Sequence, residues 1–168
     1  MRNIAQIIEV SMASMAGILL VSGVAWAQAS KEPVSGEVDR YVMVDPGEIW
    51  EDEEGVLHIR NERYRERYTG DTEDDISGRQ FKISGYTIDP VTGDVDYHGS
   101  FTFVGYVGLD LVTATGRIVA QCTGRSCEET DIWHLEDGRK ILLTEVWSVG
   151  GSGVGVYEGI LLDPPGHR

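Results

Sequence analysis

Basic residues, cysteine and histidine are all scarce in this chain. Its 168 residues include 14 Lys and Arg against 28 Asp and Glu, with 2 Cys and 4 His, and its net charge is −14. Such an acidic surface repels phosphate backbones and anionic lipid headgroups, and no stripe of Lys or Arg offsets this repulsion. We therefore expect no nucleic-acid partner.

Long apolar runs are absent except at the start of the chain. Arg2 supplies a positive charge, residues 12–24 are almost all small and apolar, and Ala25-Trp26-Ala27 and Ala27-Gln28-Ala29 each offer a small-x-small cleavage pattern. This order predicts a signal peptide over residues 1–29 and a secreted or periplasmic mature protein. Because no cysteine stands at the cleavage site to accept a lipid, we expect no stable membrane anchor.

The only two cysteines lie close together in the sequence. Cys122 and Cys127 enclose Thr-Gly-Arg-Ser, whereas redox motifs usually enclose two residues at the start of a helix. In an oxidising compartment, an even pair around a short polar turn predicts a disulfide that closes a hairpin.

Metal-ligand spacing is missing as well. A zinc site needs several Cys or His side chains at close spacing, and the histidines are isolated from one another and from the cysteines. The acidic run at residues 51–54 lacks the spaced oxygen ligands of a calcium-binding loop. We therefore expect no metal and no cofactor. The histidines are His58, His98, His134 and His167.

Helical periodicity is absent after residue 29, and short alternating apolar runs take its place. Pro90 and Gly93 predict a turn between two such runs, because proline presets a turn dihedral and glycine accepts a positive φ. Asp137-Gly138 predicts a second tight hairpin. Eight strands are expected, over residues 40–44, 56–69, 80–88, 95–104, 109–121, 130–136, 139–148 and 154–162.

Consecutive strands with short connections predict an all-β fold with one domain. Residues 40–168 are expected to form a single eight-stranded antiparallel up-and-down barrel, because closure removes both sheet edges. A two-sheet β-sandwich is the alternative. Residues 30–39 mix charges, proline and glycine without periodicity, which predicts a flexible lead-in. Glycines inside the predicted strands indicate sharp bends or close backbone approaches; they are Gly85, Gly99, Gly116, Gly155 and Gly159.

Four segments carry a resemblance to a known family. They are Leu57-His58-Ile59-Arg60, Tyr68-Thr69-Gly70-Asp71, Gly99-Ser100-Phe101-Thr102-Phe103 and Gly153-Val154-Gly155-Val156-Tyr157-Glu158-Gly159. Their order resembles the small secreted, lipocalin-like barrels of the allene oxide cyclase and dirigent type. The resemblance implies a barrel that holds a small apolar molecule, with cofactor-free chemistry in some members. It assigns no catalytic residue to any position here.

Strand alternation nominates two carboxylates as interior groups. Glu145 shares a strand face with Ile141, Leu143 and Trp147, and Glu158 shares one with Val154, Val156, Ile160 and Leu162. A carboxylate among apolar groups loses hydration, so its pKa rises towards values useful for proton transfer. The alternative is that each points outward or pairs with an arginine.

The strand over residues 56–69 offers polar groups on one face. His58, Arg60, Glu62, Tyr64, Glu66 and Tyr68 alternate there, and at a barrel mouth they would orient a polar-ended ligand. Cross-strand ion pairs with the nearby acidic segments would explain the same charges without a function. Glu62 joins Glu145 and Glu158 as a candidate catalytic residue. The candidate ligand-binding residues are His58, Arg60, Tyr64, Tyr97 and Trp147.

Three functions are therefore open. The first is a secreted barrel that binds a small, partly apolar molecule in its interior. The second is a cofactor-independent cyclase or isomerase that resembles allene oxide cyclase. The third is a non-catalytic envelope or interaction protein with a solid barrel, since side chains alone can fill eight strands. Oligomer formation is open in each case.

Overall fold

The structure is a computed structural model that describes residues 30–148 and 154–164. These residues form an all-β fold, as predicted, and they contain no helix of the length and hydropathy that crossing a membrane requires. The predicted signal peptide and the Gly150-Gly151-Ser152-Gly153 loop lie outside the described residues. The strands are β1 (Lys31–Asp45), β2 (Glu48–Glu51), β3 (Leu57–Gly70), β4 (Ile76–Ile88), β5 (Val95–Val107), β6 (Asp110–Thr123), β7 (Ser126–Leu135), β8 (Lys140–Ser148) and β9 (Gly155–Leu162).

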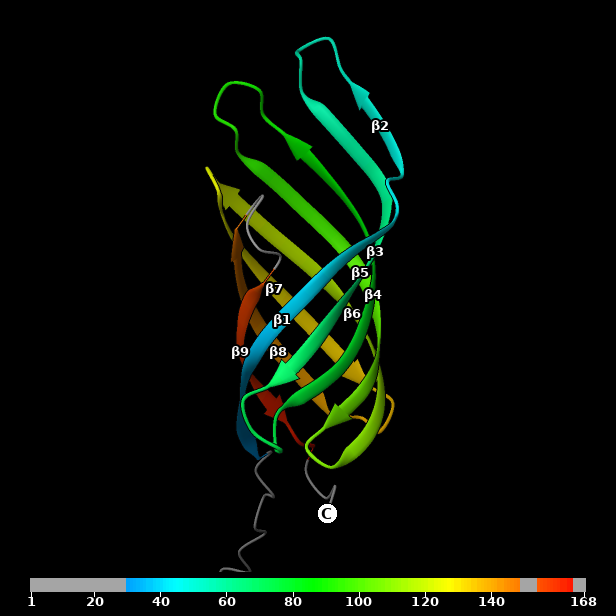
Figure 1. Cartoon of the computed structure of the whole chain (residues 1–168), viewed down its shortest axis with the longest axis vertical. Coiled ribbons are helices and arrows are strands. Elements are labelled where there is room, and N and C mark those ends of the chain that lie inside the picture. Colours follow the sequence, from blue (N-terminus) through cyan, green and yellow to red (C-terminus); the bar gives the residue numbers. More distant parts are fainter. Residues whose placement is uncertain (1–29, 149–153, 165–168) are drawn as a thin grey trace, which may run out of the picture.

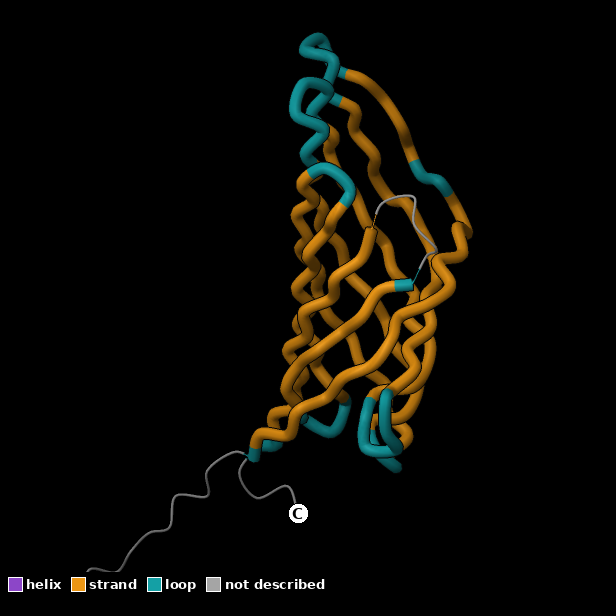
Figure 2. The backbone as a smooth tube through the Cα atoms, turned by 60° about the vertical axis from the view of Figure 1, so that its left-hand side comes forward, coloured by secondary structure: helices purple, strands orange, loops and turns teal. Residues whose placement is uncertain are grey.

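Eight of these strands close into an antiparallel barrel (Figure 1). Each strand from β3 to β9 pairs with the next, and β1 pairs with both β9 and β3, which closes the ring. The predicted eight-stranded barrel is confirmed, and it replaces the alternative sandwich of two sheets. The tube trace in Figure 2 shows the strands wound around one axis, with most of the loops at the two ends and a short break between β1 and β2 on the side.

The prediction of a flexible lead-in over residues 30–39 is wrong. These residues begin β1, whose pairing runs from Lys31 opposite Leu162 to Asp45 opposite Arg63. Val34 and Val38 are buried in the core. The segment lacks strand periodicity because the inward position 36 is a glycine, which has no side chain. A Cβ on Gly36 would lie 2.7 Å from the Tyr157 hydroxyl oxygen, so the glycine leaves room for the Tyr157 ring.

β2 is an additional strand that the sequence analysis missed. It pairs with the first four residues of β3, whereas β1 pairs with the second half of the same strand edge. Pro46 and Gly47 separate β1 from β2, and Gly47 has a φ of 71°, which favours glycine. The outer ends of β2, β3, β4 and β5 project beyond the other strands (Figure 1, cyan and green). The barrel is therefore taller on one side, and we call this end the open end.

The disulfide between Cys122 and Cys127 is present, as predicted. The two cysteines face each other in the β6–β7 register, and pairing continues to Thr123 and Ser126. β7 therefore begins at Ser126, four residues earlier than the sequence predicted, because the bridged hairpin keeps its register up to the turn. The predicted turns at Pro90–Gly93 and Asp137-Gly138 lie between β4 and β5 and between β7 and β8.

Replacing both Cys122 and Cys127 with serine should lower the free energy of unfolding by about 2 kcal/mol, because the bridge closes a short loop. The melting temperature should fall by a few degrees while the fold is retained. Thermal denaturation of the wild type with and without reductant, beside the double variant, measures the effect. Two free thiols in natively exported protein, detected by alkylation and mass spectrometry, would contradict the bridge.

Aromatic side chains fill the central part of the barrel. Trp133 is 0 % exposed, and its ring centroid lies 4.9 Å from that of Phe101, 4.7 Å from that of Phe103 and 5.3 Å from that of Tyr68. Glycines on neighbouring strands leave the space for these rings. A Cβ on Gly116 would overlap the Phe101 ring, and one on Gly78 would lie 2.6 Å from Phe103 Cζ. The strand glycines thus mark close approaches, as expected.

Candidate functional site

Between the aromatic core and the open end, the barrel interior is lined with polar side chains. Inward positions alternate along each strand, so β7 and β8 direct carboxylates to the axis from one side while β3 and β4 direct polar groups from the other. We call this set the polar layer. Its members are Glu62, Glu66, Gln80, Lys82, Ser84, Glu129, Asp131 and Glu145.

Lys82 stands at the centre of the polar layer and is 1 % exposed. Its Nζ lies 2.5 Å from Glu129 Oε1 and 2.8 Å from Glu66 Oε2, and 3.8 Å from Glu145 Oε2. Burial alone would lower the pKa of the lysine, but the nearby carboxylates outweigh burial and hold that pKa well above its ordinary value. Lys82 therefore remains an ammonium group.

Glu145 faces Lys82 and also accepts a hydrogen bond from the Tyr68 hydroxyl. Burial raises the pKa of Glu145 to about 8, although Lys82 opposes this rise. Burial, together with the adjacent Glu145 charge, also raises the pKa of Tyr68 well above its ordinary value. The pair therefore joins a neutral phenol to a carboxyl group that can exchange a proton near neutral pH.

Asp131 lies beside this pair and is 0 % exposed. Its Oδ2 accepts hydrogen bonds from Gln80 Nε2 at 3.4 Å and from Trp133 Nε1 at 3.3 Å, while its Oδ1 has no hydrogen-bond partner. Burial and the neighbouring Glu129 carboxylate raise the pKa of Asp131 well above its ordinary value. Burial likewise raises the pKa of Glu66.

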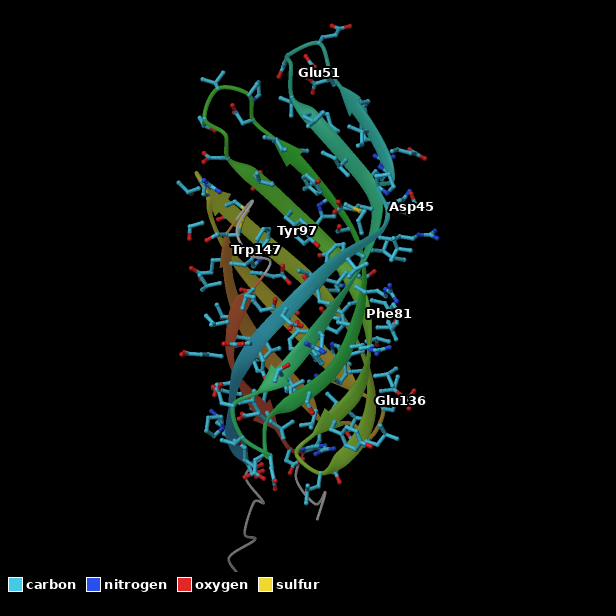
Figure 3. All side chains as sticks on the ribbon, in the orientation of Figure 1. Asp45, Glu51, Phe81, Tyr97, Glu136 and Trp147 are labelled. Atoms are coloured by element: carbon cyan, nitrogen blue, oxygen red, sulfur yellow. A yellow bond between two sulfur atoms is a disulfide. The ribbon has the colours of Figure 1, made fainter. Side chains whose placement is uncertain are left out.

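Towards the open end, the inward side chains become apolar and half-buried. The Tyr86 and Tyr97 rings stack with centroids 6.0 Å apart, and the Tyr64 and Tyr97 hydroxyls share a hydrogen bond. Figure 3 shows Tyr97 and Trp147 at similar height, below the projecting β2–β3 and β4–β5 hairpins. The half-buried inward residues, which we call the mouth, are Leu57, Tyr86, Ile88, Val95 and Trp147.

Several sequence-predicted site residues meet inside the barrel. Glu145, Tyr64 and Tyr97 are buried, and Glu62 is buried beside Ser84, whose hydroxyl donates a hydrogen bond to it at 3.2 Å. Trp147 is half-buried at the mouth. These five residues therefore come from three different strands, β3, β5 and β8, to one end of the interior.

The placement of His58 and Arg60 inside the barrel is wrong. Asn61 has a φ of 61°, and the β3–β4 register shifts between Arg60 and Glu62. This bulge reverses the alternation, so Ile59 faces inward while His58 and Arg60 face outward. There His58 stacks on Trp50 with ring centroids 5.0 Å apart, and its Nε2 lies 2.7 Å from Asp52 Oδ2. Arg60 covers the same Trp50 ring.

Glu158 also lies outside the barrel, contrary to the hypothesis of an interior role. Its neighbours Tyr157 and Leu161 are buried, whereas Val156 and Ile160, on the face of Glu158, are exposed. The outer face of β9 is thus partly apolar, and for this reason strand alternation wrongly assigned that face, with Glu158, to the interior. The outward position of Glu158 was the alternative that the sequence analysis had left open.

Three central residues of the polar layer were missed from the sequence, namely Lys82, Glu129 and Asp131. A usable signal was present on β7, where Cys127, Glu129, Asp131, Trp133 and Leu135 alternate with exposed residues. The predicted strand began at residue 130, so it included Asp131 but excluded Cys127 and Glu129.

Two surface hollows among the described residues lie away from the polar layer. One, of about 500 Å³, lies at the end opposite the open end, where Arg139 pairs with Asp110 and Asp137. The other, of about 590 Å³, lies on the outer wall of β6 and β7 around Gln121 and Glu128.

Comparison of the chain with models of protein families, with curated proteins and with solved structures finds no match.

Proposed function

We propose that the open end of the barrel binds a small, partly apolar molecule with a positively charged or hydrogen-bond-donating head group. The observation that carries this proposal is the change in chemistry along the axis. Half-buried apolar and aromatic groups at the mouth give way to a buried layer rich in carboxylates. A ligand with an apolar body and a donor head matches both zones.

The sign of the head group follows from the charges of the polar layer. Glu66, Glu129 and Glu145 lie around one lysine, Lys82, and Asp131 lies beside Glu129 and Glu145. Glu62, nearer the mouth, adds a further carboxyl group. An anionic head would meet repulsion in a poorly solvated space, whereas an amine would gain ion pairs or charge-assisted hydrogen bonds.

The proposal includes a secreted or periplasmic location. The Cys122–Cys127 disulfide is typical of oxidising compartments. The resemblance of the sequence pattern to the allene oxide cyclase and dirigent barrels supports the expectation of a ligand inside the barrel. Fold alone does not establish a function.

A second candidate function is cofactor-independent isomerisation or cyclisation, and Glu145 is the reason to retain it. This carboxyl group combines a pKa of about 8 with a hydrogen bond from Tyr68, which suits a general acid or base. Glu145 is buried within the polar layer, so a substrate would have to enter that layer to reach it. A solid barrel without a ligand is the remaining alternative, because side chains already fill the centre.

Binding of 4-phenylbutylamine, compared with 4-phenylbutanoic acid, tests the proposed function. The amine should bind with a Kd of about 1 mM or tighter and at least about tenfold more tightly than the acid. Trp147 fluorescence should report the binding, and isothermal titration calorimetry should give the affinity.

Glu62→Gln should weaken binding of the amine, whereas Glu158→Gln is the matched control on the outer wall and should not. Trp147→Phe should remove the fluorescence change but retain the calorimetric signal. Equal affinity for amine and acid, or no binding of either, would contradict the proposal and favour the solid barrel.

A further inference from the structure

We infer that Glu129, Asp131 and Glu145 form a binding site for a hard divalent cation of the Ca²⁺ or Mn²⁺ type inside the barrel. Each residue offers one carboxylate oxygen, and these three atoms all lie within 4.8 Å of one another. Two oxygens bound to one Ca²⁺ at about 2.4 Å can lie at most about 4.8 Å apart. An all-oxygen, all-carboxylate ligand set favours Ca²⁺, Mg²⁺ or Mn²⁺ over softer metals.

The strand register fixes these ligands close together. Glu129 on β7 is directly opposite Glu145 on β8, and Asp131 is the next inward residue of β7. Like charges directly opposite each other on adjacent strands are destabilising. A bound cation would convert this repulsion into coordination.

An independent observation concerns the second oxygen of Asp131. Asp131 is fully buried, its Oδ2 accepts from Gln80 and Trp133, and its Oδ1 has no hydrogen-bond partner. A buried acceptor without a partner is costly. Coordination to a cation would supply the missing partner.

Lys82 does not balance the charge by itself. If Lys82 is assigned to Glu66, which lies 2.8 Å away on β3, these two side chains are neutral together. When Glu129, Asp131 and Glu145 are all ionised, they carry three negative charges, and a divalent cation reduces this excess to one. Burial raises the pKa of Asp131 and of Glu145, so a bound cation must displace protons from them. Protons are the competing source of neutralisation, so the experiment must separate the two.

Terbium luminescence provides a probe that reports position as well as binding. Trp133 Nε1 lies 3.3 Å from Asp131 Oδ2, so Tb³⁺ at the inferred site would be excited through a buried indole. The mature, disulfide-bonded protein is titrated with Tb³⁺ after treatment with EDTA, and Ca²⁺ or Mn²⁺ is then added in competition. Each titration is repeated after unfolding and refolding with the ion present, so that slow entry does not hide a site.

Wild-type protein should show sensitised Tb³⁺ emission that Ca²⁺ and Mn²⁺ displace, and its melting temperature should rise by several degrees with millimolar Ca²⁺. Asp131→Asn should weaken ion binding by at least about tenfold. Loss of a residue that only supports a ligand already weakens metal binding by about tenfold or more, and Asp131 is inferred to be a ligand itself. Glu158→Gln, which alters an exposed carboxyl group on the outer wall of β9, should bind the ion like the wild type.

Absence of sensitised emission in both preparations of the wild type would overturn the inference. Equal emission from the wild type and from Asp131→Asn would also overturn it, because the ion would then occupy acidic surface groups. An Asp131→Asn variant that is more stable than the wild type at every Ca²⁺ concentration would show that protons neutralise the layer. Amine binding, in which the head group is proposed to contact the same polar layer, is measured separately and does not decide these outcomes.

Discussion

Replacing Lys82 with methionine is expected to lower the free energy of unfolding by about 3–5 kcal/mol. Removal of one partner from a buried ion pair leaves the other charges without compensation. Lys82 contacts Glu66 and Glu129 and lies 3.8 Å from Glu145, and its ammonium group is fully buried. Methionine has a similar length and keeps the packing, so the loss of unfolding free energy reports the removal of the ammonium charge.

Urea denaturation in buffer with EDTA measures this loss. The matched control is Lys140→Met, which removes an exposed lysine and should change stability by less than about 0.5 kcal/mol. Adding Glu129→Gln to Lys82→Met should recover part of the lost stability, because one uncompensated carboxylate is then removed. A Lys82→Met variant as stable as the wild type would refute the central role given to this lysine.

Replacing Trp133 with alanine is expected to destabilise the protein by about 3–5 kcal/mol, as large aromatic truncations in cores do. The ring is fully buried between Tyr68, Phe101 and Phe103. Its loss leaves a cavity at the centre of the barrel. It also removes one of the two hydrogen bonds that Asp131 accepts.

The control for this substitution is Trp50→Ala on β2. Trp50 is 39 % exposed and stacks on His58 outside the barrel, so its removal should cost about 1 kcal/mol or less. Guanidinium denaturation of both variants gives the comparison. Similar losses for the two tryptophans would contradict the placement of the core around Trp133.

The parts of the fold that were predictable are those set by neighbouring residues. Pro90 with Gly93, and Asp137 with Gly138, act within a few residues and position their hairpins correctly. The predicted strand over residues 40–44 lies within β1, but residues 31–39 were missed because their partners on β9 and β3 lie far away in the sequence. The local composition of this segment, with Pro33 and Gly36, gives no strand pattern of its own.

The candidate site was predictable only where alternation is unbroken. Glu145 and Tyr97 lie on regular strands and were placed correctly near the interior. A single residue, Asn61, reverses the alternation of β3, so the argument failed for His58 and Arg60. The meeting of Lys82 with Glu129 joins β4 to β7 across the barrel, and no spacing rule along the chain anticipates such a contact.

Closure of the barrel through β1 has a consequence for folding kinetics. Lys31 pairs with Leu162, so the closing contacts join the two ends of the described chain, and such long-range pairing slows folding. Until it forms, β3 and β9 present open edges, on which other extended chains can add. The risk of aggregation during folding therefore depends on how long these two edges stay unpaired, more than on the stability of the finished barrel.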